Sequence, residues 1–216
     1  YCSRREYKAG TMCNNIDSNK IDLNSEPPLD EPARQFYFME KCRGYVSGLK
    51  ERLGRSPSFF IQTFGCQMNF HDSEKIVAIL ERIGFVEAEG ENADFVLYNT
   101  CTVRENANET VYWRLGQLKR IKKNNPEMII GICGCMMQEE HVIEKIRKSY
   151  KFVDIVFGTH NIFKFAELLY ARLRSGEQII DIWKEADRIV EELPVDRKYD
   201  FKCGFNIMYG CNNFCS

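Results

Sequence analysis

The chain has 216 residues and a formal net charge of −1, with 44% hydrophobic and 28% charged residues. This length is enough for one to two domains with an apolar core, and the composition is ordinary for a globular protein. It contains no run of about 18 apolar residues, which a membrane-spanning helix would need. The polar residues 1–10 do not form the apolar segment of a secretory signal. We therefore expect a cytoplasmic protein with no membrane contact.

The N-terminal residues divide into an arm and a helix. Residues 1 to about 30 are rich in Asn, Asp, Ser and Pro, a composition typical of poorly ordered segments. Residues 31–53 follow an approximate helical apolar stripe that includes Phe36 and Met39, and Gly54 is a suitable stop. We interpret residues 1–55 as an N-terminal extension with one helix.

Residues 56–175 alternate between apolar strands and amphipathic helices. Asp72 is available to cap the helix that begins at Ser73. Continuous apolar strands between such helices indicate a parallel sheet covered on both faces, so the expected class is α/β with a flavodoxin- or Rossmann-like sheet. The predicted strands are 58–64, 95–99, 128–133 and 152–157, and the predicted helices are 73–83, 105–123, 139–149 and 162–174.

The C-terminal residues indicate a linker and the start of another domain. Residues 176–202 are charged and loosely patterned, as in a linker. Residues 205–208 read as a new strand, and the chain ends eight residues later. We therefore expect residues 203–216 to be the truncated start of a second domain.

Three of the ten cysteines directly follow predicted strands: Cys66, Cys101 and Cys135. The carboxyl ends of parallel strands lie on one edge of a sheet, where ligands bind. These three thiols should therefore converge, although about 35 residues separate each from the next. Cys133, in contrast, lies within a strand and is expected in the core.

Three convergent thiolates indicate a metal site. Structural zinc prefers four ligands, which His71 near Cys66 could help to supply. An iron–sulfur cluster prefers thiolates, and with three of them a 4Fe–4S cube would keep one iron open. Three ordinary buried cysteines remain the alternative. Cys211 and Cys215 form a separate CxxxC pair, which is weak by itself.

Several blocks in order carry a resemblance to a known family. They cover about residues 57–216 and read TFGCQMNFHDSE, YNTCTVRENA, RLGQLK, GICGCMMQ, VFGTHNI and MYGCNNFCS. With these blocks the chain resembles the methylthiotransferases of the radical-SAM superfamily. Within that family it looks like the enzymes that modify N6-dimethylallyladenosine in tRNA.

The resemblance implies two 4Fe–4S clusters and S-adenosyl-L-methionine. Cys66, Cys101 and Cys135 match the ligands of the auxiliary cluster. Cys211 and Cys215 match the first two ligands of the radical-SAM cluster, whose third ligand is absent from this chain. Residues 56–175 would be the N-terminal methylthiotransferase domain, and residues 203–216 would begin the radical-SAM barrel.

The implied reaction adds a methylthio group to C2 of the prenylated adenosine at position 37 of tRNA. The implied partners are that tRNA, with the modified base next to the anticodon, and an electron donor such as flavodoxin or ferredoxin. The chain alone is expected to be inactive without the barrel. The rival interpretations are a sister methylthiotransferase acting on a ribosomal protein or on threonylcarbamoyladenosine, a cluster-free flavodoxin-like binding module, and a structural zinc domain.

Overall fold

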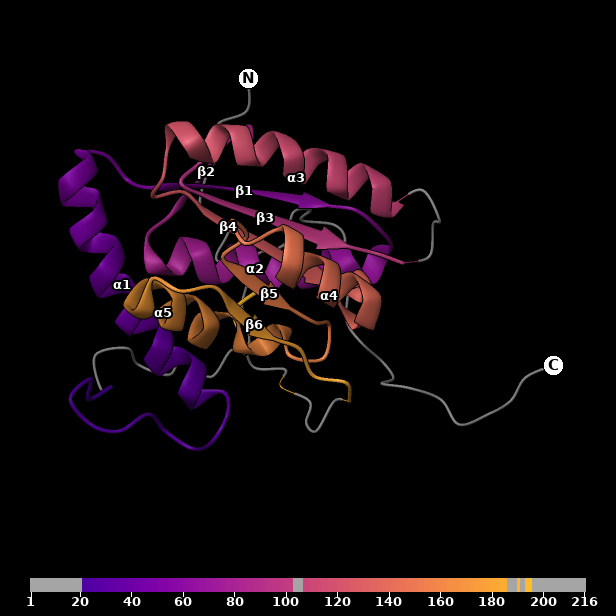
Figure 1. Ribbon diagram of the computed structural model, residues 1–216. Coiled ribbons are helices and arrows are strands. Elements are labelled where there is room, and N and C mark those ends of the chain that lie inside the picture. The colour runs from indigo at the N-terminus through magenta and orange to yellow at the C-terminus, as the bar shows by residue number, and fades with distance from the viewer. Residues whose placement is uncertain (1–20, 103–106, 186–189, 191–192, 196–216) are drawn as a thin grey trace, which may run out of the picture.

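A computed structural model describes residues 21–102, 107–185, 190 and 193–195. It contains a six-stranded sheet in the order β2-β1-β3-β4-β5-β6, with helices on both faces (Figure 1). Every pair of neighbouring strands is parallel. The predicted α/β class is confirmed.

The two central strands explain why the sequence reads as continuous apolar runs. All six residues of β3 and all six of β4 are buried, since helices cover both faces of the sheet. The strands are β1 Ser58–Thr63, β2 Val86–Glu87, β3 Phe95–Thr100, β4 Ile129–Gly134, β5 Ile155–Phe157 and β6 Ile179–Asp181.

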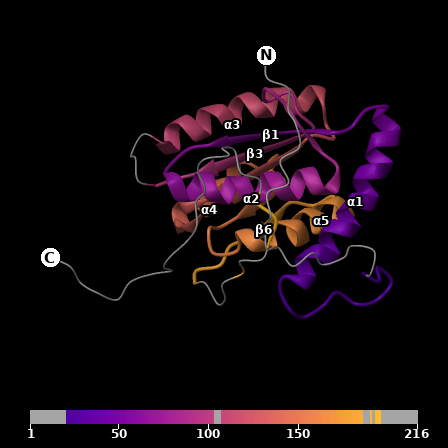
Figure 2. The same ribbon diagram turned by 180° about the vertical axis from the view of Figure 1, so that it is seen from behind.

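The helices divide between the faces of the sheet. α1, α2 and α5 share one apolar cluster, and α3 and α4 share the other. In Figure 1, α2 passes behind the strands, whereas it lies in front of them in Figure 2. The helices are α1 Ala33–Leu53, α2 Gln67–Ile83, α3 Ala107–Asn124, α4 Glu140–Ser149 and α5 Phe165–Ser175, with short 3₁₀ turns at Cys135–Gln138 and Ile162–Lys164.

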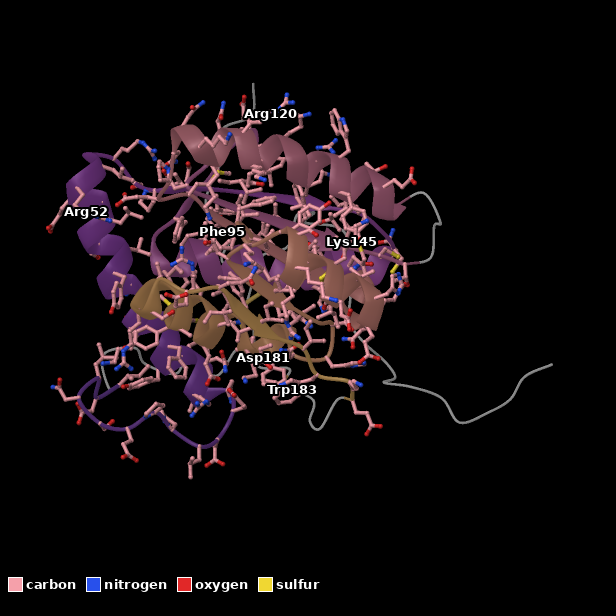
Figure 3. All side chains as sticks on the ribbon, viewed as in Figure 1. Arg52, Phe95, Arg120, Lys145, Asp181 and Trp183 are labelled. Carbon is pink, nitrogen blue, oxygen red and sulfur yellow. The ribbon has the colours of Figure 1, made fainter. Side chains whose placement is uncertain are left out.

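Aromatic packing anchors the first of these clusters. The Phe95 side chain on β3 is fully buried and makes edge contacts with Phe85 and Phe165. Figure 3 shows Phe95 inside the molecule, with Arg52 on α1 and Arg120 on α3 at its periphery. Fully burying such a side chain is worth roughly 1.5–3 kcal/mol.

Two sequence-based boundaries need correction. α2 begins at Gln67, with Cys66 at its N-cap position, so Asp72 lies inside the helix and does not cap it. The segment interpreted as a linker from residue 176 contains β6, which pairs with β5. β6 was missed because a three-residue edge strand has no distinctive periodicity.

The predicted extension also contributes to the core. α1 begins two residues later than expected, and its Phe36, Met39 and Cys42 lie in the same apolar cluster as α2 and α5. This helix thus packs with residues 56–175. Among the helices that the structure describes, none is long and apolar enough to cross a membrane. The predicted strand at 205–208 and the second-domain start at 203–216 lie outside the described residues.

A buried ion cluster ties β5 to helices on both faces of the sheet. The Asp154 carboxylate, 8% exposed, pairs with Lys122 on α3 and with Arg172 on α5, whose Nη2 lies 2.8 Å away. The same carboxylate accepts a 2.7 Å hydrogen bond from the Ile130 N–H of β4. Lys122 belongs to the basic end of α3, and this contact gives it a structural role.

Asp154→Ala should lower the free energy of unfolding by about 3–5 kcal/mol, because it leaves two cations unpaired near the protein interior. Urea denaturation measures this. The control is Glu144→Gln, which removes the partner of an exposed lysine, Lys148, and should leave the free energy of unfolding close to that of the parent chain. Equal effects of the two substitutions would contradict the role given to Asp154.

Candidate metal centre

The register of the sheet aligns the segments that carry the three cysteines. Thr63 on β1 lies opposite Asn99 on β3, and Asn99 lies opposite Cys133 on β4. Cys66 follows Thr63 by three residues, whereas Cys101 and Cys135 follow Asn99 and Cys133 by two. The chain therefore brings all three cysteines to the carboxyl edge of neighbouring strands, as predicted.

The cysteines also lie at the switch point of the sheet. β2 is added on one side of β1, whereas β3 and the later strands are added on the other side, so the switch point lies between β1 and β3. In open α/β sheets, ligands bind outside the carboxyl ends of the strands at such a switch point. Cys66 and Cys101 follow the two strands that flank it, and Cys135 follows the next strand, β4.

The three thiols differ in exposure, and the other two affect the ionisation of Cys135. Cys66 is exposed, Cys135 is half-buried and Cys101 is buried. Burial, followed by the proximity of Cys101 and Cys66, raises the pKa of the Cys135 thiol. Cys133 is fully buried in the core, as predicted, and burial raises the pKa of its thiol well above the ordinary value.

Buried polar side chains connect the cysteine-bearing loops. Asn69 Oδ1 accepts hydrogen bonds from the N–H and from Sγ of Cys66, both at 3.3 Å. Asn69 Nδ2 donates to Asn99 Oδ1 at 2.9 Å and to the Thr100 carbonyl at 3.0 Å. Asn99 Nδ2 donates to the Asn69 carbonyl at 2.8 Å and to Ser73 Oγ at 3.0 Å.

Two glycines let the loops approach each other closely. A Cβ at Gly65 would lie 2.5 Å from Asn69 Oδ1 and 2.7 Å from the Cys101 Cβ. A Cβ at Gly134 would lie 2.1 Å from the Thr100 carbonyl oxygen. Both glycines have positive φ, 152° and 103°. The residues before Cys66 and Cys135 thus have to lack a side chain.

The donor set suits a thiolate-bound cluster. Among the described residues, no three His, Cys, Asp or Glu side chains already form a group that could hold a metal ion. A polynuclear cluster is larger than a single ion, however, so its thiolates do not have to meet at one point. Three soft sulfur donors, side-chain-free glycines and loops at one edge fit such a group, provided that the thiols turn toward it.

Two other polar side chains of α2 lie close to Cys66 in sequence. His71 Nδ1 is buried 3.5 Å from Glu74 without a hydrogen-bond partner, and burial lowers the pKa of His71, which favours the neutral imidazole that metals bind. Among the described residues, however, His71 belongs to no group of three side chains that could hold a zinc ion. Burial raises the pKa of Asp72 to about 6, partly offset by Lys75. Cys211 and Cys215 lie outside the described residues, so their role stays a prediction.

The sequence also places Asn69, Asn99, Thr100 and Arg104 beside the cysteines, where they could donate hydrogen bonds near a cluster or to a substrate. Sequence reasoning missed Ser73, whose Oγ lies 2.8 Å from Thr63 Oγ1 and completes the polar network. No sequence signal marks these contacts, because a polar residue on a helix reads as exposed until its partners are known. The flanking Arg104 lies outside the described residues.

Gly134→Ala should destabilise the chain by about 2–5 kcal/mol, since it combines a left-handed backbone with a clash against the Thr100 carbonyl. Urea denaturation tests this against Gly54→Ala. Gly54 also has a positive φ, 66°, but a Cβ there would have no neighbour within 4 Å. A cost at Gly134 no greater than at Gly54 would contradict the close approach of the loops.

Known proteins match the chain in two ways. Residues 58–158 match the model of a family described as "Uncharacterized protein family UPF0004". A tRNA-2-methylthio-N(6)-dimethylallyladenosine synthase of Lachnoclostridium phytofermentans is 65% identical over 82% of this chain and 39% of its own length. A protein with the same name from Clostridioides difficile is 46% identical over 88% of this chain and 40% of its own length.

The matched segments include the cysteine-bearing part of the sheet. Residues 58–158 run from β1 to just beyond β5, and so contain Cys66, Cys101 and Cys135. The chain spans about two fifths of the length of these curated relatives. Over that part it belongs to the methylthiotransferase family that they represent.

Proposed function

We propose that the chain is part of an enzyme that adds a methylthio group to C2 of N6-dimethylallyladenosine at position 37 of tRNA. In this proposal Cys66, Cys101 and Cys135 hold an auxiliary 4Fe–4S cluster. The observation that carries the proposal is the placement of these thiols at one sheet edge, on the segment shared with relatives named for this reaction.

The residues of the chain would bind and orient the cluster. Cys66 lies at the N-cap of α2, where free N–H groups and the helix dipole favour a negatively charged sulfur. The buried Cys101 would bind the cluster on the side that faces the protein interior, and the half-buried Cys135 would supply the third thiolate. When bound, such a cluster supplies an iron with an open position that can present sulfur.

The exposure of the site agrees with a large substrate. Met68 and Phe70, on the first turn of α2 beside Cys66, are 51% and 45% exposed. Their apolar surfaces would exclude water from the reacting base once the edge is covered. The proposed partners are the prenylated tRNA and an electron donor such as flavodoxin or ferredoxin. Cys211 and Cys215 would hold the radical-SAM cluster beside S-adenosyl-L-methionine.

The strand order also favours a second candidate. The order of the first five strands, β2-β1-β3-β4-β5, is that of flavodoxin-like proteins, so a cluster-free binding module has the same architecture. That alternative does not explain why a thiol follows each of β1, β3 and β4. Metal loading separates the two functions.

Anaerobic reconstitution with iron and sulfide should load about four irons on these cysteines. Cys66→Ala, Cys101→Ala and Cys135→Ala should each lose that iron, because every variant removes one of only three thiolates. Iron and sulfide analysis measures this in a Cys211→Ser, Cys215→Ser background.

Cys133→Ala is the matched control, because Cys133 is only two residues from Cys135 but lies within β4 and is fully buried in the core. It should retain the iron of its parent. If no variant differs from its parent, or if Cys133→Ala loses iron as the others do, the ligand assignment is wrong. An absence of iron from the parent itself would favour the cluster-free module.

A further inference from the structure

Two buried asparagines lie at the centre of the three cysteine-bearing loops. The Asn69 residue is 1% exposed and Asn99 is fully buried. Asn69 Oδ1 accepts a hydrogen bond from the Cys66 N–H at 3.3 Å, and Asn69 Nδ2 donates one to the Thr100 carbonyl at 3.0 Å. These two backbone groups belong to the first cysteine and to the residue before the second. One amide therefore bridges the loops that follow β1 and β3.

The orientation of each amide is fixed by its backbone partners. The Cys66 N–H can only donate and the Thr100 carbonyl can only accept, so Asn69 must present Oδ1 to the first and Nδ2 to the second. Asn99 Nδ2 is fixed in the same way, because it donates to the Asn69 carbonyl. Both N–H groups of each amide are satisfied.

The end of β4 lies against one of the two asparagines, Asn99. A Cβ at Gly134 would lie 2.7 Å from Asn99 Oδ1 as well as 2.1 Å from the Thr100 carbonyl oxygen. Gly134 immediately precedes Cys135. The asparagine pair thus hydrogen-bonds to the backbone beside Cys66 and Cys101 and leaves no room for a side chain at Gly134, beside Cys135.

Helix–sheet packing alone does not require this pair. Elsewhere α2 packs on the sheet through buried apolar side chains such as Ile76 and Ile79. Burying two amides is costly unless every hydrogen bond is made, and a fully satisfied network fixes one geometry. The polar network lies at the cysteine-bearing end of α2, where such fixed geometry would serve a site.

We propose that Asn69 and Asn99 are positioning residues that set the relative placement of the Cys66, Cys101 and Cys135 thiols. The proposal rests on the proposed function in assigning these thiols a common ligand. The pair hydrogen-bonds to the backbone of Cys66 and Thr100, lies against Gly134, and does not bind the ligand. The Cys66 Sγ hydrogen bond to Asn69 Oδ1 is lost when the thiol binds as a thiolate, whereas the bond from the Cys66 N–H remains.

The test uses sodium arsenite, since trivalent arsenic is a soft ion that binds three thiolates and requires no iron chemistry. Arsenite binding to the full chain is measured by titration of the thiolate–arsenic absorption, in a Cys211→Ser, Cys215→Ser background. Asn69→Ala and Asn99→Ala are compared with Asn161→Ala. Loss of arsenite binding in Cys66→Ala, Cys101→Ala and Cys135→Ala identifies the three thiols as its site.

Asn161, which follows β5 and contacts β6, is a matched control. It is fully buried, and its amide also bridges two backbone groups, the Gly158 N–H at 3.0 Å and the Asp181 carbonyl at 2.7 Å. Asn161→Ala should therefore lower the melting temperature by an amount similar to Asn69→Ala. A purely structural role for Asn69 would then predict similar arsenite affinities.

We expect Asn69→Ala and Asn99→Ala to weaken arsenite binding by about tenfold or more, and Asn161→Ala to leave it within about twofold of the parent, as for residues that orient metal ligands. If Asn69→Ala does not fold, Ser73→Ala, which removes one acceptor of Asn99 and the hydroxyl partner of Thr63, should weaken binding in the same direction.

Equal affinities in the asparagine variants and the control would overturn the positioning role, and so would a parent chain whose three thiols bind no arsenite. Iron analysis distinguishes this failure from that of the proposed function. A parent that binds arsenite at the three cysteines but takes up no iron would refute the cluster and leave the positioning role supported.

Discussion

The parallel pairing of β1, β3 and β4 is the constraint on which the site depends. Parallel strands end on the same edge, and the register that aligns Thr63, Asn99 and Cys133 places each following cysteine just beyond it. A one-residue shift in the β1–β3 or β3–β4 pairing would turn each side chain of the shifted strand to the opposite face of the sheet. Because the apolar clusters on both faces oppose such a shift, they also fix where each strand ends and where the following thiol lies.

The end of the sheet that carries the cysteines contains a buried network of uncharged polar side chains. Most of the buried surface is aliphatic and aromatic, but Asn69, Ser73 and Asn99 bring polar groups into the interior beside the cysteines. Their hydrogen bonds, with Gly65 and Gly134 at the points of closest approach, hold three loops in contact. Stability and site geometry thus depend on the same contacts, and substitutions have to be compared with matched controls.

The sequence was sufficient to predict the class of fold and the edge of the sheet at which the cysteines lie. Both followed from long apolar strands such as β3 and β4, whose burial on two faces leaves a clear pattern. It was not sufficient for β2 and β6, because strands of two or three residues take their conformation from their neighbours. The start of α2 was misplaced because the Cys66–Asn69 cap is not a standard sequence signal, whereas Asp72 is. The asparagine network depends on contacts across about 30 residues of chain, which a local pattern does not record.

The most direct measurement is a crystal structure of the reconstituted Cys211→Ser, Cys215→Ser chain with anomalous diffraction data collected at the iron absorption edge. The account predicts anomalous density at the carboxyl edge of β1, β3 and β4, within bonding distance of Sγ of Cys66, Cys101 and Cys135 and not of Cys133. Iron density bonded to only one or two of these sulfurs, or located elsewhere on the chain, would contradict it.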